Sequence, residues 1–175
     1  MRFTQTCNLA AAILLATLTA TAYAADKPSD AQIAHIAYTG GDLDIKAAKV
    51  ALEKSKNADV RAFADNMVKD HTAVNDKALA LVKKLGVTPE DNDTSKGLVK
   101  EQDEKQAELA KLSGPAFDKA YVDNEVAFHK TVIGALEKTL IPSTENAELK
   151  SLLQTGLKIF QGHEEHAEQI AAGLK

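Results

Sequence analysis

One stretch of the chain, residues 58–85, places its core-type side chains at intervals of three and four without a break. The series includes Val60, Phe63, Met67 and Leu85, and it follows a single face of a helix. A strand would require alternation at every second residue, and no segment of the sequence sustains that pattern. A long helix with one apolar face must bury that face against other helices. The sequence therefore predicts an all-α fold.

Three further segments have the same periodicity. Ser29-Asp30-Ala31-Gln32 is a capping-box pattern that opens a first helix. Pro115 begins a third main helix that runs to about Leu140, and a fourth follows Pro142. Residues 95–112 are helical in composition but mostly charged, which predicts a crossover or a partly exposed helix. Together these elements predict an antiparallel four-helix bundle with an extra crossover helical segment.

Two details of the helices carry further expectations. Gly40-Gly41 lies inside the first helix, where each glycine costs about 1 kcal/mol relative to alanine. Such a pair indicates a close helix approach, a kink or a neighbour that needs room. On the fourth helix we expect these side chains to face inward: Leu149, Leu152, Gly156, Ile159, His163, His166 and Ile170.

The first 24 residues have the three regions of a cleaved export signal. Arg2 supplies the positive charge, residues 9–20 are apolar, and Ala22-Tyr23-Ala24 has the small-x-small pattern of a cleavage site. The apolar run is short for a helix that spans a bilayer, which needs about 20 residues, and no later stretch is longer. We predict a signal peptide over 1–24, a single bundle domain over 25–175 and a periplasmic location. A retained membrane-anchoring helix and association with the cell envelope are the alternatives.

Composition narrows the classes of function. The net charge is −4 with interspersed signs, so nucleic acid is not an expected partner. Cys7 is the single cysteine, which excludes a disulfide framework, a thiolate zinc site and a CxxC redox pair. The sequence has neither a Gly-x-Ser-x-Gly elbow nor a phosphate-binding loop, so an enzyme is less favoured than a binding protein. The pattern identifies no protein partner.

Polar residues on the core-facing stripes are the candidate site. A histidine or carboxylate buried among apolar side chains must be hydrogen-bonded, paired or bound to a metal. The candidates are Asp44, His71, Glu125, His129 and His163. Counted along ideal helices, the first four lie at about the same depth, ~20 Å from a bundle end. His163 lies roughly 10 Å from that level when counted through Pro142, which makes it the weaker member geometrically.

Imidazole and carboxylate ligands from facing helices suit a divalent transition metal, namely zinc, iron, copper or manganese. Di-iron bundles carry Glu-x-x-His on two helices, whereas Val68 and Phe160 stand three residues before His71 and His163. This departure favours a mononuclear, histidine-rich site over a di-iron site that carries out oxygen chemistry. Met67 fits core packing better than ligation. Asp70 fits a solvated position or one that orients His71, and whether His166 joins the site is open.

Two functions agree with this pattern. In the first, the bundle binds a metal ion and serves in metal handling or stress protection. In the second, it is a structural or stress-associated envelope protein whose core histidines form a hydrogen-bonded network without metal. Histidine-to-alanine variants separate the two, because only the first function loses a bound metal.

Residues 60–72, VRAFADNMVKDHT, resemble the hallmark of the domain of unknown function 4142 family. Phe117 to Tyr121, then Glu125, His129 and His163, resemble the rest of that pattern, so the resemblance covers most of residues 29–174. It implies a ferritin-like bundle in an exported bacterial protein, with functional importance at His71, His129 and His163. Relatives often have a glutamate where this chain has Asp44, a shorter acid with a different reach toward a metal. The family has no assigned reaction.

Overall fold

The computed structural model describes residues 27–174, and the predicted signal peptide lies outside this range. The long helices are α1 (Asp30–Lys54), α2 (Ala58–Leu85), α3 (Asp93–Ala110), α4 (Gly114–Ala135) and α6 (Ala147–Gly173). A π-helical turn, η1 (Leu136–Leu140), and the short α5 (Ile141–Ser143) extend α4 toward the final connection. Within 27–174, no helix combines the length and apolar character needed to cross a membrane.

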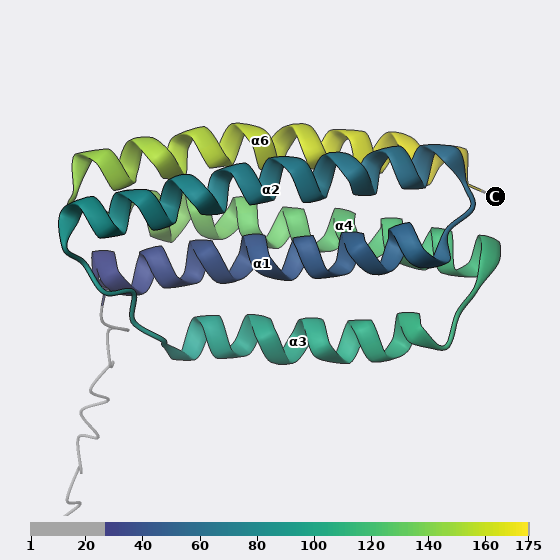
Figure 1. Ribbon diagram of the computed structural model, residues 1–175, viewed down its shortest axis with the longest axis horizontal. Helices are drawn as coiled ribbons and strands as arrows, with labels where there is room; N and C mark the ends of the chain where they lie inside the picture. Colours follow the sequence, from purple (N-terminus) through teal and green to yellow (C-terminus); the bar gives the residue numbers. More distant parts are fainter. Residues whose placement is uncertain (1–26, 175) are drawn as a thin grey trace, which may run out of the picture.

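Helices α1, α2, α4 and α6 lie side by side, and each is antiparallel to its neighbours (Figure 1). Helix α3 packs along the outer side of α1 and carries the chain back over the length of the bundle. As a result α2 and α4 run in the same direction, which is the connectivity of bundles with one long crossover. The predicted all-α fold is confirmed, and the described helices form an antiparallel bundle with a crossover helix.

The helix boundaries have the local causes that the sequence indicated. Ser29 caps α1, and its side chain and that of Gln32 form the reciprocal hydrogen bonds of a capping box. Gly86 follows α2 with a φ of 65°, a left-handed conformation that glycine adopts without steric cost. Pro115 occupies the first turn of α4, where its missing N–H leaves no helical hydrogen bond unmade.

The apolar core is divided into two parts by a polar layer. The part beside the α1–α2 turn contains Phe63, Met67 and Tyr121, all with no exposed surface. The part toward the other end of the bundle contains Ile33, Leu136 and Phe160. Met67 is therefore a core residue, as predicted. The candidate site residues occupy the layer between the two parts.

Gly41 marks a close approach between α1 and α2. A Cβ atom at Gly41 would lie 2.5 Å from Oδ1 of Asn75, whose Nδ2 donates a hydrogen bond to the carbonyl of Tyr38 at 3.3 Å. This is one of the three explanations expected for the glycine pair. Gly40 differs, because a Cβ there would meet no atom within 4 Å.

The predicted inward face of α6 was wrong by one residue at three positions, including His166, which is half-buried beside the buried Ala167. Leu153 and Phe160 are buried, whereas Leu152 and Ile159 are half-buried. Helix α6 packs against both α2 and α4, so two neighbours together set the direction of its buried face. A single apolar stripe could not define that direction.

Candidate metal centre

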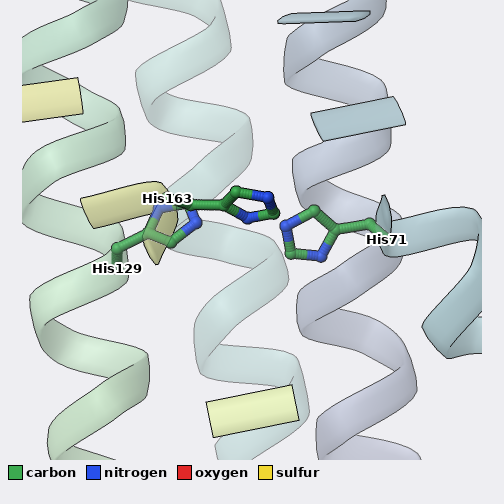
Figure 2. Close-up of side chains that lie close together, drawn as sticks. All are labelled: His71, His129 and His163. Carbon is green, nitrogen blue, oxygen red and sulfur yellow. The ribbon is translucent and has the colours of Figure 1, made fainter. Parts of the chain in front are cut away.

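Three buried histidines from three helices meet in the polar layer (Figure 2). His71 extends from α2, His129 from α4 and His163 from α6. The ring centroids are 5.1 Å apart for His71 and His163, 5.7 Å for His129 and His163, and 6.0 Å for His71 and His129. One nitrogen of each ring lies within 4.8 Å of the other two. From this spacing, small side-chain shifts would be enough to place all three nitrogens ~2 Å from a shared metal ion, the length of a metal–imidazole bond.

The predicted offset of His163 was wrong. Helix α4 and its extensions continue to Ser143, and α6 begins at Ala147 after a short connection. The path from His129 up to that connection is therefore nearly as long as the path down to His163, and the two rings differ in level by less than one helical turn. The histidine that counting had made the weaker member has its ring centroid within 5.7 Å of those of both other histidines.

Two carboxyl groups adjoin the histidines. Asp44 on α1, Glu125 on α4 and His129 form a second group whose ligand atoms lie within 4.8 Å of one another. Oδ2 of Asp44 is 3.4 Å from Nε2 of His71, without the geometry of a hydrogen bond. Oε2 of Glu125 is 3.7 Å from Nδ1 of His129. All five candidate residues are thus brought together, four of them with at most 1% of their surface exposed.

Hydrogen bonds fix the tautomers of two histidines. Nδ1 of His129 donates to the carbonyl oxygen of Glu125 at 2.8 Å, because a carbonyl can only accept. Nε2 of His163 donates to Oδ2 of Asp70 at 3.1 Å for the same reason. The remaining lone pairs are therefore on Nε2 of His129 and Nδ1 of His163. Metal-binding histidines are typically held in this way, with the second ring nitrogen donating to a carbonyl or carboxylate.

Eight side-chain atoms of the cluster have no hydrogen-bond partner in the geometry of residues 27–174. They are both oxygens of Asp44, both oxygens of Glu125, both ring nitrogens of His71, Nε2 of His129 and Nδ1 of His163. A buried polar atom without a partner costs about 1–3 kcal/mol. A protonated carboxyl of the Asp44–Glu125 pair can donate to the other, but the four ring nitrogens among these atoms have no such partner and require an explanation. Metal coordination would use these lone pairs, and the donor set therefore fits a transition-metal ion.

Burial sets the ionisation of the cluster. It lowers the pKa of His71 to about 2, assisted by the nearby His163 and His129, and it lowers the pKa of His129 to about 4. It raises the pKa of Glu125 to about 8 and, with the charge of Glu125, raises the pKa of Asp44 well above its ordinary value. At neutral pH the imidazoles are neutral and have the lone pairs that a metal needs. A bound cation would favour the ionised carboxylates by direct attraction.

Two neighbours of the cluster were not identified from the sequence. Tyr121 has a buried hydroxyl whose pKa is raised by burial and by Glu125 and Asp44. The ring of Phe160 packs 4.9 Å from that of His71 and 5.6 Å from that of His129. Each stands three or four residues before a candidate residue on the same helix. Ordinary core residues share this spacing, so the sequence does not distinguish Tyr121 and Phe160 from them.

Three other residues considered near the site are not among its candidate ligands. His166 is half-buried with its ring 5.4 Å from that of Phe63, and it is not part of either ligand group in the described chain. Asp70 orients a histidine as one of its expected roles, but the histidine is His163 rather than His71. His35 lies half-buried on α1, with Nδ1 3.5 Å from the hydroxyl of Thr39.

By its fold and its cluster, the chain is a helical-bundle protein with a buried group of histidines and carboxyls. The chain belongs to the family described as "Domain of unknown function (DUF4142)", whose sequence profile matches residues 15–170. No functionally curated protein matches the sequence.

Two solved structures share the fold. CopM in its Cu(II)-bound form has a TM-score of 0.64 and 15% sequence identity, over 85% of this chain and 100% of that chain. A DUF305 protein from Streptomyces coelicolor has a TM-score of 0.68 and 10% identity, over 82% of this chain and 92% of that one. At these identities the likeness concerns the fold alone.

Proposed function

We propose that the protein binds one divalent transition-metal ion through His71, His129 and His163, with Asp44 and Glu125 as carboxylate ligands or orienting partners. The observation that carries this proposal is the pair of fixed tautomers. The carbonyl of Glu125 and the carboxylate of Asp70 each accept a hydrogen bond from the protonated nitrogen of one histidine, which leaves the lone pair on its other nitrogen. A network that existed only for packing would use those nitrogens in hydrogen bonds.

The donor chemistry orders the candidate metals. Three imidazoles with one or two carboxylates suit zinc, copper, iron or manganese, and copper(II) has the highest affinity for such a set among these divalent ions. The Cu(II)-bound CopM structure also makes copper the first ion to test. Two ionised carboxylates would balance the charge of the ion, which the neutral histidines do not.

The role that we infer is metal handling or stress protection outside the cytoplasm. The predicted signal over residues 1–24 supports export, and a mature domain over 25–175 would then reach the periplasm. The Streptomyces coelicolor structure of the same fold is described as that of a secreted protein, which agrees with export. No catalytic residue is assigned.

The test is the metal content of the protein purified without a tag, measured by elemental mass spectrometry before and after reconstitution. We expect close to one ion per chain, lost in His71→Ala and in His129→Ala and kept in His35→Ala. Circular dichroism must show that all three variants are folded. If no metal binds after exposure to copper, zinc, iron and manganese, the site is wrong. The function would then be that of an envelope protein whose histidines only stabilise the core.

A further inference from the structure

A cavity of about 560 Å³ lies in the half of the bundle beyond the histidine layer. It is lined by side chains from α1, α2, α3, α4, η1 and α6, among them Ile36, Ala78, Val132, Leu136, Leu153 and Phe160. Packed protein interiors contain few voids larger than a water molecule. A volume of this size lies instead within the range of small-molecule sites. We propose that this cavity binds an uncharged, largely apolar small molecule, seated against Phe160.

Two buried glycines open the cavity. Gly40 on α1 and Gly156 on α6 both line it. The neighbouring Gly41 is explained by Asn75, but a Cβ at Gly40 would meet no atom within 4 Å. Helix packing therefore does not require a glycine at position 40, although glycine is unfavourable inside a helix. A guest molecule that needs the space explains why the residue is small.

The backbone next to the cavity is irregular. Leu136, Thr139 and Leu140, which line the cavity, belong to the π-helical turn η1. Single π-helical turns inside α-helices are rare and often lie at functional sites. Here the turn presents two leucines and a threonine to the same space.

The lining sets the chemistry of the guest. Asp93, at the start of α3, carries the only charge among the lining side chains of the described chain, and the lining has no cation. An anionic head group would thus find no cationic partner, whereas Gln32, Asn92 and Thr139 offer uncharged hydrogen-bonding groups to a neutral one. The walls come from five helices and the π-helical turn, so the space suits a small molecule rather than a folded partner. The expected guest is a neutral compound with a hydrocarbon chain or ring.

This site is separate from the proposed metal centre but shares one residue with its surroundings. Phe160 lines the cavity and packs against the rings of His71 and His129. The proposal does not depend on the metal, since its lining residues exclude all five candidate ligands. Failure of one proposal therefore leaves the other intact.

The test uses N-phenyl-1-naphthylamine, a neutral apolar dye whose fluorescence rises in an apolar environment. We expect saturable binding to the purified protein, and at least a tenfold weaker affinity in Gly40→Leu, whose side chain would occupy the cavity. Gly162→Leu is the matched control, because Gly162 lies exposed on α6, where a Cβ would meet no atom within 4 Å. Ala37→Leu, at another lining position, replaces Gly40→Leu if that variant does not fold.

Displacement of the dye tests the chemistry of the guest. Dodecanol should displace it at a concentration at least tenfold lower than dodecanoate, because no cation in the lining receives the carboxylate. Metal content should be unchanged in Gly40→Leu. The proposal is overturned if the dye does not saturate, if both leucine variants that point into the cavity bind it like the wild type, or if dodecanoate displaces it better than dodecanol.

Discussion

Nε2 of His163 on α6 lies 3.1 Å from Oδ2 of Asp70 on α2, so the residue next to His71 in sequence holds a histidine of another helix. The carboxylate accepts a hydrogen bond from Nε2–H, which leaves the lone pair of His163 on Nδ1. Two adjacent residues of α2 thus belong to the cluster in different ways: Asp70 orients His163, and His71 is itself a candidate ligand. This pairing leads to the first prediction.

Asp70→Ala should weaken metal binding without abolishing it. Loss of an acceptor that orients a metal-binding histidine typically costs 10–100-fold in affinity. Titration of the metal-free protein, monitored by calorimetry, gives the dissociation constant. Asp65→Ala, an exposed acid on the same helix, is the control and should bind like the wild type. An unchanged affinity in Asp70→Ala would show that His163 is not a ligand or needs no orientation.

The metal-free protein should lose stability as the pH rises from 6.5 to 8. Burial raises the pKa of Glu125 from 4.5 to about 8, so the folded state keeps a proton that the unfolded state releases. The free energy of unfolding then falls by up to about 1.4 kcal/mol per pH unit for this group. The histidines act oppositely, because their lowered pKa values add stability only as the pH rises toward 6.5.

Glu125→Gln tests this assignment, because the amide cannot ionise. Urea unfolding of the metal-free protein at pH 6.5 and pH 8 should show a smaller difference in the variant than in the wild type. Glu165→Gln, an exposed acid on α6, should keep the wild-type difference. If the unfolding free energy changes equally between pH 6.5 and pH 8 in the wild type and in Glu125→Gln, Glu125 is not protonated in the folded protein.

Gly41→Ala should destabilise the bundle although alanine favours helices. The new Cβ would lie 2.5 Å from Oδ1 of Asn75, and such overpacking typically costs about 1–3 kcal/mol. Gly162→Ala, with open space around its Cβ, should instead stabilise the protein by up to about 1 kcal/mol. Thermal unfolding followed by circular dichroism measures both changes.

The double variant Gly41→Ala/Asn75→Ala separates the clash from other causes. In the Asn75→Ala background the alanine at position 41 should no longer destabilise, since the side chain that it meets has been shortened. If Gly41→Ala costs the same free energy in both backgrounds, the close approach of Asn75 is not the reason for the glycine.

Lys54→Met should loosen the crossover helix. The ammonium group of Lys54 donates to the carbonyls of Leu109 and Ala110 at the end of α3, at 3.1 and 2.8 Å, and it lies 5.1 Å from the centre of the Phe117 ring. Loss of charge-assisted bonds to a helix C-terminus should cost about 1–2 kcal/mol.

Hydrogen exchange measures the effect on α3 directly, and faster exchange of the amides of α3 than of those of α6 is the expected result. Lys49→Met, at an exposed position on α1, is the matched control. If α3 exchanges at the wild-type rate in Lys54→Met, the lysine does not hold the end of this helix.

Much of the fold was predictable because its causes are local. The capping box at Ser29, the glycine at position 86 and the proline at 115 act within a few residues of each helix end. Their chemistry is visible in any short window of the sequence. Which residues form the buried face of α6 could not be predicted exactly, because its packing against both α2 and α4 determines that face.

The residues that cluster in the polar layer were predictable from the sequence, but their geometry was not. Five polar residues on apolar stripes were sufficient to name the cluster. The level of His163 depended on where α4 and its extensions end, which a count through Pro142 did not capture. The role of Asp70 toward His163 required knowledge of which helices are adjacent, and the cavity beside Phe160 required the volumes of side chains from every helix around it.

The distribution of the candidate ligands along the chain has a consequence for biosynthesis. Asp44 comes from the first helix and His163 from the last, so the cluster is complete only after nearly the whole chain has been made. A nascent chain that ends before α6 lacks one of the three imidazoles and the packing that excludes water from the other two. Any ion that the cluster holds must therefore be acquired by a finished bundle, and truncated chains would compete poorly for scarce metal.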